Sequence, residues 1–413
     1  MRFSPLSFLC ASFLGLLLPA SSSRGNDVFY WTSASGQWVI NEANPTSVPI
    51  VWASEPGGTI DSRWVNGASA VIEASNPAIT LAPNDRSISV DRLTIAGSMT
   101  LVGGSVNTRF LTITGGGSGN LIFAMTSSDT AANGSRLIFA GTSAWNGTIT
   151  LSADAGVAAK NRVLISAETA VDKATFLEIN GTRLELSTPT TANSTLTVGQ
   201  LKGTGGTLLF TTGTGFTKTL TLDQASDTVF AGTIEKSGAG TSALIKEGTG
   251  RLTLAGTDLI DKVSVNEGAL WVDGTLTGAV TIGAGGALGG SGRVEGSVIF
   301  NDQGILHFRL GEVGNLSFAD LKKGTDGHYL FDFEETGIMD ELYVLSTALG
   351  QGFSAFDFQA INLADGVQGS FQIVGSELRF TTMAIPEGGT MGMMFLGSIC
   401  AGSGWWRRRG RAH

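Results

Sequence analysis

The chain has 413 residues, of which 58 are glycine, 9 are proline and 15% are charged. Ordinary globular domains contain roughly 7% glycine and 25% charged residues, so this composition favours one long repetitive scaffold over several compact domains. The net charge is −9, but five of the 26 basic residues lie in the two apolar ends, which leaves 21 against 35 carboxylates, or −14, for the body. Because phosphate backbones are bound by clustered Lys and Arg, nucleic acid is not expected as a partner.

Residues 1–23 have the composition of an export signal. Arg2 precedes an apolar run over residues 8–18, and small residues follow that run. This order predicts a secretory signal peptide, with cleavage near Ser22 or Ser23. The alternative is a retained membrane anchor, but a span needs roughly 20 apolar residues and the run is shorter. We therefore expect an exported chain with a hydrophobic helix at this end.

Residues 24–80 are aromatic and irregular, and they hold half of the eight tryptophans: Trp31, Trp38, Trp52 and Trp64. The first rung of a stacked β structure has an open edge that bulky side chains cover, so we interpret this region as an N-terminal cap with the first rungs. The alternative is a platform on which sugars stack, because indole rings are amphipathic. The four tryptophans are therefore also candidate glycan contacts.

Residues 81–300 alternate apolar and polar side chains in short runs that are separated by glycine-containing breaks. Apolar residues spaced two apart share one face of a strand. Such pairs are Leu252 with Leu254, Val263 with Val265, Leu270 with Val272, Val280 with Ile282, and Val298 with Phe300. Short strands without crossover helices stack as successive rungs. The predicted fold class is therefore all-β, and the predicted architecture is a right-handed parallel β-helix, or β-solenoid.

The sequence becomes most regular within residues 244–300. It reads K-x-G-x-G-x-L-x-L-x-G-T from Lys246 and V-x-V-x-x-G-x-L from Val263, and a glycine-rich stretch continues to Val294. This pattern resembles the autotransporter-associated β-strand repeat. The resemblance implies a β-helical architecture and an exported location, but it implies no ligand and no reaction. We expect no C-terminal translocator barrel, and so not a complete autotransporter.

Residues 301–384 continue the alternation but are more charged and more aromatic. An uncovered last rung would offer its edge to another chain. We therefore expect this region to close the far end of the solenoid, in part as two or three antiparallel strands around residues 328–380.

Residues 385–413 form an apolar tail with a basic end. Residues 388–406 are nineteen positions without a charge, and four arginines lie between residue 407 and the C-terminus. Nineteen apolar or small residues just span a bilayer, and terminal arginines hold that end in the cytoplasm, so we expect a transmembrane helix. An ordinary membrane anchor would have the same features and is the alternative to a sorting signal.

The order of motif, span and basic end resembles the PEP-CTERM sorting signal. The residues that carry the resemblance are Pro386, Glu387, Arg407, Arg408 and Arg409. The resemblance implies an exosortase, a membrane-embedded cysteine transpeptidase, as a partner, and transient anchoring in the inner membrane. The sequence departs from the family at Gly388, which stands in place of a second proline.

The body offers few residues for catalysis or metal binding. A serine nucleophile needs a histidine base, and only His307 and His328 are available. The two cysteines, Cys10 and Cys400, both lie in the apolar ends. A zinc site needs three or four nitrogen or sulfur ligands, which the body cannot provide. We expect no enzymatic activity, no cofactor and no metal.

Carboxylates gather in one region near the C-terminal end: Asp332, Glu334, Glu335 and Asp340. Glycoside hydrolysis needs two carboxylates at a defined separation, and Asp332 and Glu334 share a strand face. The alternative is a solvated acidic strand and turn, since carboxylates without a partner are mostly exposed. A cleft lined by three or more carboxylates, or by an arginine with carboxylates, would favour a carbohydrate-active enzyme, whereas an even, sparsely charged face would favour a structural or adhesive protein.

The sequence as a whole favours a secreted protein without catalytic activity, sorted to the cell surface, the outer envelope or the extracellular matrix. It would serve there as a structural or adhesive spacer, with an exopolysaccharide or a cell-surface glycan as a second partner. The alternative is a carbohydrate-active enzyme or a glycan-binding protein on the same β-helix scaffold.

Overall fold

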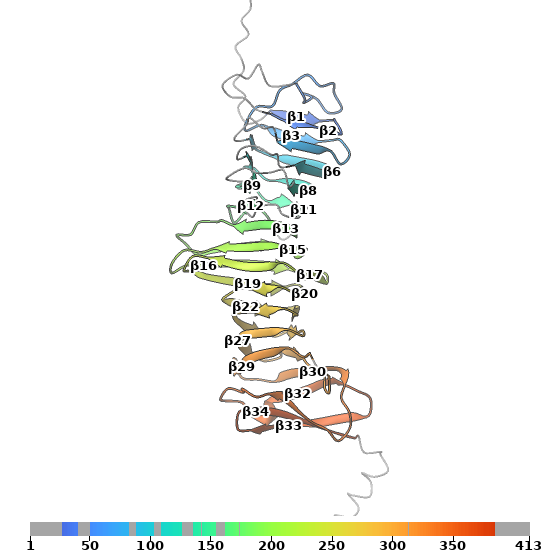
Figure 1. Ribbon diagram of the computed structural model, residues 1–413, viewed down its shortest axis with the longest axis vertical. Coiled ribbons are helices and arrows are strands. Elements are labelled where there is room, and N and C mark those ends of the chain that lie inside the picture. The colour runs from blue at the N-terminus through green and yellow to red at the C-terminus, as the bar shows by residue number, and fades with distance from the viewer. Residues whose placement is uncertain are drawn as a thin grey trace, which may run out of the picture.

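The computed structural model is a long column of short strands, which runs from the N-terminal end of the described chain at one tip to the C-terminal end at the other (Figure 1). The predicted signal peptide and the predicted sorting tail lie outside the described residues. The structure describes residues 27–39, 50–81, 88–102, 109–125, 135–141, 143–153, 162–172, 174–312 and 314–384.

Strands make up most of the described chain. In the N-terminal half they are β1 (Val28–Trp31), β2 (Ser35–Trp38), β3 (Ser69–Ile72), β4 (Ala78–Leu81), β5 (Ile88–Val90), β6 (Leu93–Val102), β7 (Arg109–Ile113), β8 (Gly117–Met125), β9 (Ser135–Phe139), β10 (Trp145–Asn146), β11 (Thr148–Ala153), β12 (Arg162–Ile165), β13 (Phe176–Leu186), β14 (Ser194–Val198), β15 (Gln200–Thr211) and β16 (Thr217–Asp223). In the C-terminal half they are β17 (Thr228–Phe230), β18 (Thr233–Ser237), β19 (Thr241–Glu247), β20 (Arg251–Leu254), β21 (Thr257–Asp258), β22 (Lys262–Val265), β23 (Gly268–Val272), β24 (Thr275–Leu276), β25 (Ala279–Ile282), β26 (Gly286–Gly289), β27 (Arg293–Phe300), β28 (Ile305–His307), β29 (Ser317–Lys323), β30 (Tyr329–Thr336), β31 (Leu342–Ser346), β32 (Phe358–Leu363), β33 (Val367–Val374) and β34 (Glu377–Ala384).

The predicted all-β class is confirmed. Over the described ranges, the one helical element is a three-residue 3₁₀ turn, η2 (Ala355–Asp357). None of the helices in these ranges is long and apolar enough to cross a membrane. The two predicted hydrophobic helices, within residues 1–23 and 385–413, fall outside them.

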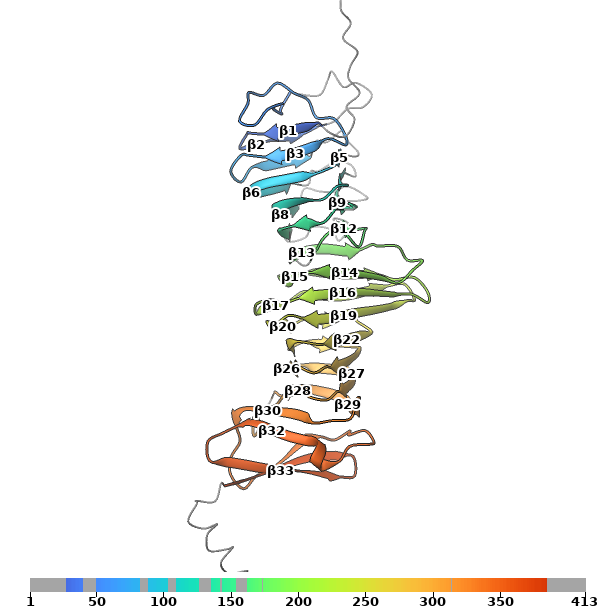
Figure 2. The ribbon, with the colours of Figure 1, turned by 180° about the vertical axis from the view of Figure 1, so that it is seen from behind.

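Successive rungs stack in parallel, so that each strand pairs with a strand one rung further along the chain (Figures 1 and 2). One series runs β17, β20, β23, β26, β28, β30 and β32, and another runs β14, β16, β19, β22, β25, β27 and β29. In the first series Leu252, Leu270, Leu288 and Leu306 pair in turn, which gives these rungs a repeat of 18 residues. This large parallel sheet is compatible with a β-solenoid.

Apolar side chains at alternate strand positions fill the interior of the column. Each member of the five residue pairs predicted to share a strand face is at most 1% exposed. Burial of each such side chain stabilises the fold by roughly 1.5–3 kcal/mol. The hydrophobic effect on these alternating side chains is therefore the main contribution that holds successive rungs together. The predicted strand faces are confirmed.

The tryptophans of the N-terminal region pack against one another inside the first rungs. Trp31, Trp38 and Trp52 are 0% exposed and Trp64 is 3% exposed, with neighbouring ring centroids 4.8–5.0 Å apart. The segment that carries Trp52 also pairs with the first rung, because Tyr30 and Ala53 exchange two backbone hydrogen bonds of 2.9 Å. Buried rings offer no face on which a sugar could stack, so these four residues are not glycan contacts in this arrangement.

Three antiparallel strands close the other end, in the order β31, β34, β33. A cluster of aromatic rings joins them to the last parallel rungs, with centroids 4.6–6.4 Å apart: Phe331, Phe333, Phe358, Phe371 and Phe380. The antiparallel strands lie within residues 342–384, a range that also contains the parallel strand β32. Strand β30, which lies in the region predicted to be antiparallel, still pairs in parallel with β28 and β32.

Two buried lysines tie rungs together through backbone carbonyls. Lys246 is 0% exposed, and its Nζ donates to the carbonyl oxygens of Glu247, Gly248 and Glu267 at 2.9, 2.7 and 3.1 Å. Burial lowers the pKa of Lys246 to about 8, and it lowers that of Lys218, which also donates to two carbonyls, to about 8. The lysine that opens the repeat-like pattern is therefore an internal tie and not a surface charge.

Candidate functional site

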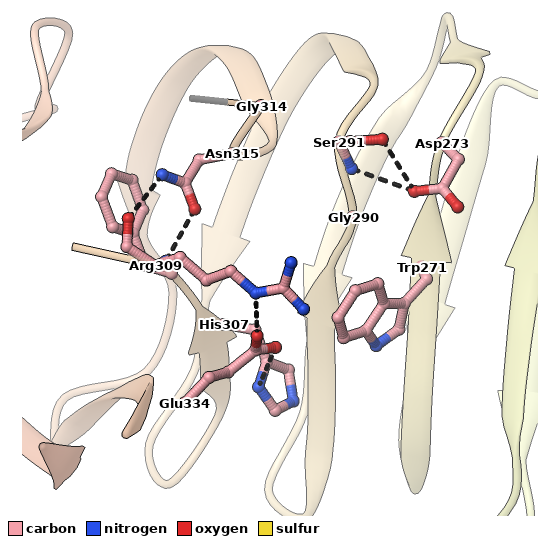
Figure 3. Close-up of a pocket in the computed structure, with 10 residues that line it drawn as sticks. Trp271, Asp273, Gly290, Ser291, His307, Arg309, Gly314, Asn315 and Glu334 are labelled. Carbon is pink, nitrogen blue, oxygen red and sulfur yellow. Dashed lines mark hydrogen bonds and ion pairs between the residues drawn. The ribbon is translucent and has the colours of Figure 1, made fainter. Parts of the chain in front are cut away.

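A pocket of about 230 Å³ opens on the outer face of the column, toward its C-terminal end (Figure 3). It lies along the series of strands β23, β26, β28 and β30, so four successive rungs contribute to it. The side chains that line it combine one large aromatic ring with charged, hydroxyl and amide groups: Trp271, Asp273, Ser291, His307, Arg309, Asn315 and Glu334.

A glycine lies between the two rings, of Trp271 and His307, that line the pocket. The register of the rungs places Trp271, Gly289 and His307 in one outward column. The ring centroids of the Trp271 indole and the His307 imidazole lie 5.7 Å apart, on either side of Gly289. A Cβ on Gly289 would lie 3.0 Å from the Cβ of His307. On the far side of the indole, the Cζ atom of Arg251 lies 5.1 Å from the ring centroid, at cation–π distance. The indole is thus held in place from both sides.

One wall of the pocket is a carboxylate fixed at a rung corner. Asp273 Oδ1 accepts hydrogen bonds from the backbone N–H of Ser291 at 3.0 Å and from its hydroxyl at 3.1 Å (Figure 3). Both side chains belong to exposed residues. The pairing joins two successive rungs and holds the carboxylate at the rim of the pocket.

The opposite wall is a turn that an asparagine closes. The backbone N–H of Arg309 donates to Asn315 Oδ1 at 2.7 Å, and Asn315 Nδ2 donates to the carbonyl oxygen of Arg309 at 2.8 Å. The side chain of Arg309 donates through Nε to the carboxylate of Glu334 (Figure 3). This charged hydrogen bond raises the pKa of Arg309, so the guanidinium remains a cation. The wall therefore presents amide and guanidinium groups in fixed positions.

Next to this wall, one imidazole lies close to two carboxylates. His307 Nδ1 lies 3.4 Å from Asp332 Oδ2 and 3.5 Å from Glu334 Oε1. Asp332 also accepts the backbone N–H of Glu334 at 2.9 Å and the Nδ2 of Asn362 at 3.0 Å. Both carboxylates are thus engaged by neighbouring groups.

The backbone next to these carboxylates is strained. Glu334 and Glu335 have φ angles of 51° and 60°, in the left-handed region that residues with a Cβ rarely adopt. The pairing of β30 with β32 shifts register between Asp332 and Thr336. Bulges of this kind redirect side chains, and here the bulge accompanies a Glu334 side chain that reaches Arg309.

The structure brings together two of the four predicted carboxylates. Asp332 and Glu334 meet at His307, whereas Glu335 and Asp340 are exposed and line no part of the pocket. The pocket combines Arg309 with Asp273 and Glu334, which is the arrangement of an arginine with carboxylates that was expected of a carbohydrate-active enzyme. The predicted sorting residues, Pro386, Glu387 and Arg407 to Arg409, lie outside the described residues.

Sequence reasoning missed most of the pocket. Asp273, Ser291 and Arg309 lie 18 residues apart in turn, as do Trp271, Gly289 and His307. This spacing equals the rung repeat, so it could have indicated that these residues are neighbours. It can be recognised only when the length of the repeat is known.

Neither a metal site nor a known relative adds to this description. In the described part of the chain, no group of three or more His, Cys, Asp or Glu side chains is placed to hold a metal ion. No protein-family model, curated protein or solved structure matches the chain. The resemblances to the autotransporter-associated repeat and to the PEP-CTERM signal rest on the residues quoted for them and stay predictions.

Proposed function

We propose that the protein is an exported β-solenoid without catalytic activity, which serves as a stiff adhesive spacer at the cell surface or in the extracellular matrix and holds a saccharide in the Trp271 pocket. One observation carries the adhesive part of this proposal. A partly exposed indole lies on the outer face of the column beside fixed carboxylate, guanidinium and amide groups.

The chemistry of a sugar ring suits this combination of groups. A pyranose has a face of C–H groups, which packs on an amphipathic aromatic ring. Its edge carries hydroxyls, for which Asp273 and Asn315 supply acceptors and Arg309 supplies donors. Hydrogen bonds to neighbouring residues hold all three in place before a ligand arrives, which reduces the entropy lost on binding.

The spacer part of the proposal follows from the length of the column and from the ends of the sequence. We infer a right-handed winding, since almost all parallel crossover connections have that hand. The signal-peptide pattern supports export, and the tail pattern supports transient anchoring in the inner membrane and processing by an exosortase-type enzyme. An exopolysaccharide or a cell-surface glycan would then be the partner outside the cell.

A carbohydrate-active enzyme is the second candidate, because Asp332 and Glu334 flank one histidine at the pocket. We favour binding over catalysis for a structural reason. Glu334 is held by Arg309, and Asp332 by Asn362 and by the backbone of Glu334. A catalytic pair must meet the substrate with its oxygens. The enzyme hypothesis would gain if alanine at Glu334 and Glu335 abolished a polysaccharide-degrading activity of the protein.

The Trp271→Ala variant is expected to lose at least about tenfold in glycan affinity, or roughly 1.4 kcal/mol, because the stacking surface is removed. The mature protein would be screened on a glycan array, and the best glycan would then be titrated by calorimetry. Thr253→Ala is the matched control, since Thr253 pairs with Trp271 one rung away but does not line the pocket. Equal affinity for the Trp271→Ala and Thr253→Ala variants, or no glycan bound by the wild type, would contradict the saccharide site.

Deletion of residues 386–413 is expected to abolish surface or matrix location in the native host. The full chain should yield a mature protein that lacks the mass of the tail and is found outside the inner membrane. Cell fractionation and intact mass spectrometry measure both properties. Recovery of the full chain in the inner-membrane fraction with its tail intact would mean an ordinary anchor, and the sorting proposal would be withdrawn.

A further inference from the structure

Three arginines stack in register on the outer face of successive rungs. Arg136 pairs with Arg162, and Arg162 pairs with Arg183. They lie on strands β9, β12 and β13, which follow one another along the column (Figure 2). The apolar residue that follows each of them is buried, so the arginines point outward. Neighbouring strands lie about 4.8 Å apart, which makes this a ladder of like charges at close spacing. We call these three residues the arginine ladder.

The same outward column continues along the rod with side chains that donate hydrogen bonds. Beyond the arginine ladder it holds Thr207, Thr233, Thr257, Thr275, Arg293 and Ser317. No carboxylate occurs at these nine positions, although acidic residues outnumber basic ones in the chain by 35 to 26. The column is therefore a stripe of hydroxyls with three stacked cations at one end and a single further cation, Arg293, near the other.

Two members of the arginine ladder form ion pairs with nearby carboxylates. Arg162 Nη1 lies 3.0 Å from Glu185, and Arg183 Nη2 lies 3.7 Å from Glu235, of which the second pair is the more exposed. Burial and the charge of Arg162 lower the pKa of Arg136, as expected for stacked cations. Arg162 and Arg183 keep about a quarter of their side-chain surface exposed, at 26% and 27%. An incoming anion would reach these guanidiniums from solvent.

We infer that the arginine ladder and the adjoining threonines bind an acidic polysaccharide laid along the axis of the rod. A linear chain with a carboxylate or sulfate on each sugar offers repeated anions to repeated guanidiniums, and its hydroxyls meet those of the threonines. Nucleic acid fits less well, because none of these nine positions carries an aromatic side chain on which the bases of a single strand could stack. This site lies on different strands from the Trp271 pocket and does not depend on it.

The experiment measures binding of the full mature protein to polygalacturonate, dextran sulfate, neutral dextran and double-stranded DNA. Wild type is expected to bind the two acidic polysaccharides but not dextran, with an affinity that falls as salt is raised. The double variant Arg162→Gln, Arg183→Gln is expected to lose at least about tenfold in affinity. The matched control is Arg293→Gln, an exposed arginine in the same column but outside the ladder, for which a change below about twofold is expected.

A second variant tests whether a loss of binding results from a loss of folding. Removal of Arg162 alone leaves Glu185, which is 8% exposed, without its cation. The pair Arg162→Gln, Glu185→Gln keeps the net charge and should still lower the affinity. The inference is overturned if Arg293→Gln is as damaging as the ladder variant, if the wild type binds no acidic polysaccharide, or if DNA binds as tightly. Loss of acidic polysaccharide binding in Trp271→Ala would place the ligand in the pocket and would also overturn it.

Discussion

The Gly274→Ala variant is expected to unfold with a free energy lower than that of the wild type by roughly 3 kcal/mol or more. A Cβ on Gly274 would lie 1.9 Å from the carbonyl oxygen of Gly256, directly beneath it in the preceding rung. That carbonyl also accepts the backbone N–H of Thr275 at 2.9 Å. The rungs cannot separate to admit a methyl group without breaking this bond, because strand spacing is fixed by the hydrogen-bond ladder.

Chemical denaturation followed by circular dichroism measures this effect. Gly205→Ala is the matched control, since Gly205 lies in the same parallel sheet and a Cβ there would meet no atom within 4 Å. Its free energy of unfolding should stay within about 1 kcal/mol of the wild type, because alanine mainly lowers the entropy of the unfolded chain. If the two alanine variants were equally stable, the close approach of rungs at Gly274 would not exist as described.

Stability is also expected to depend on pH through one buried carboxylate. Asp258 faces the interior of the column of strands, is 0% exposed and accepts the backbone N–H of Ile234 at 2.9 Å through Oδ1. Its Oδ2 has no hydrogen-bond partner among the described atoms. Burial raises the pKa of Asp258 from 3.8 to about 7. The folded protein therefore keeps a proton on Asp258 that the unfolded chain releases.

The sign of the effect follows from this difference. Between about pH 4 and pH 7 the folded state binds more protons than the unfolded state, so this residue's contribution to stability is present below pH 4 and is lost as the pH rises to 7. A neutral isostere avoids the loss. The Asp258→Asn variant is expected to match the wild type near pH 4 and to be more stable by about 2–4 kcal/mol near pH 8.

The measurement is the difference in unfolding free energy between the Asp258→Asn variant and the wild type at several pH values. The difference isolates Asp258, because the contributions of the other titratable groups are common to both proteins and cancel. Asp261, for example, has a lowered pKa despite its burial, since Lys236 and Ser242 hydrogen-bond to it. A difference that stays constant from pH 4 to pH 8 would show that Asp258 does not titrate in this range.

The sequence located one part of the candidate site and missed the rest for a geometric reason. Asp332 and Glu334 were found together because they lie two residues apart on one strand, so their shared face follows from the strand itself. The Trp271 pocket joins residues from four rungs. Its residues become neighbours only through the stacking of β23, β26, β28 and β30. The strained bulge at Glu334 also depends on pairing between distant strands.

The arginine ladder could not be predicted from the sequence at all. Its residues lie 26 and then 21 positions apart, so no constant period reveals them. The lengths of the loops between rungs set that spacing, and those lengths vary along the column. Only the register of the parallel strands shows that Arg136, Arg162 and Arg183 stack.

The sequence by itself determined the all-β class and which side chains of each strand face inward, because alternation and glycine-containing breaks act within a few residues. It also carries the patterns at both ends from which export and sorting are proposed. Tertiary structure alone decided that Trp31, Trp38, Trp52 and Trp64 are buried, that Trp271 is partly exposed beside a pocket, and that three arginines form a ladder. In a column of stacked parallel strands, strand register places residues far apart in sequence side by side, and register is fixed by loop lengths and by the packing of whole rungs.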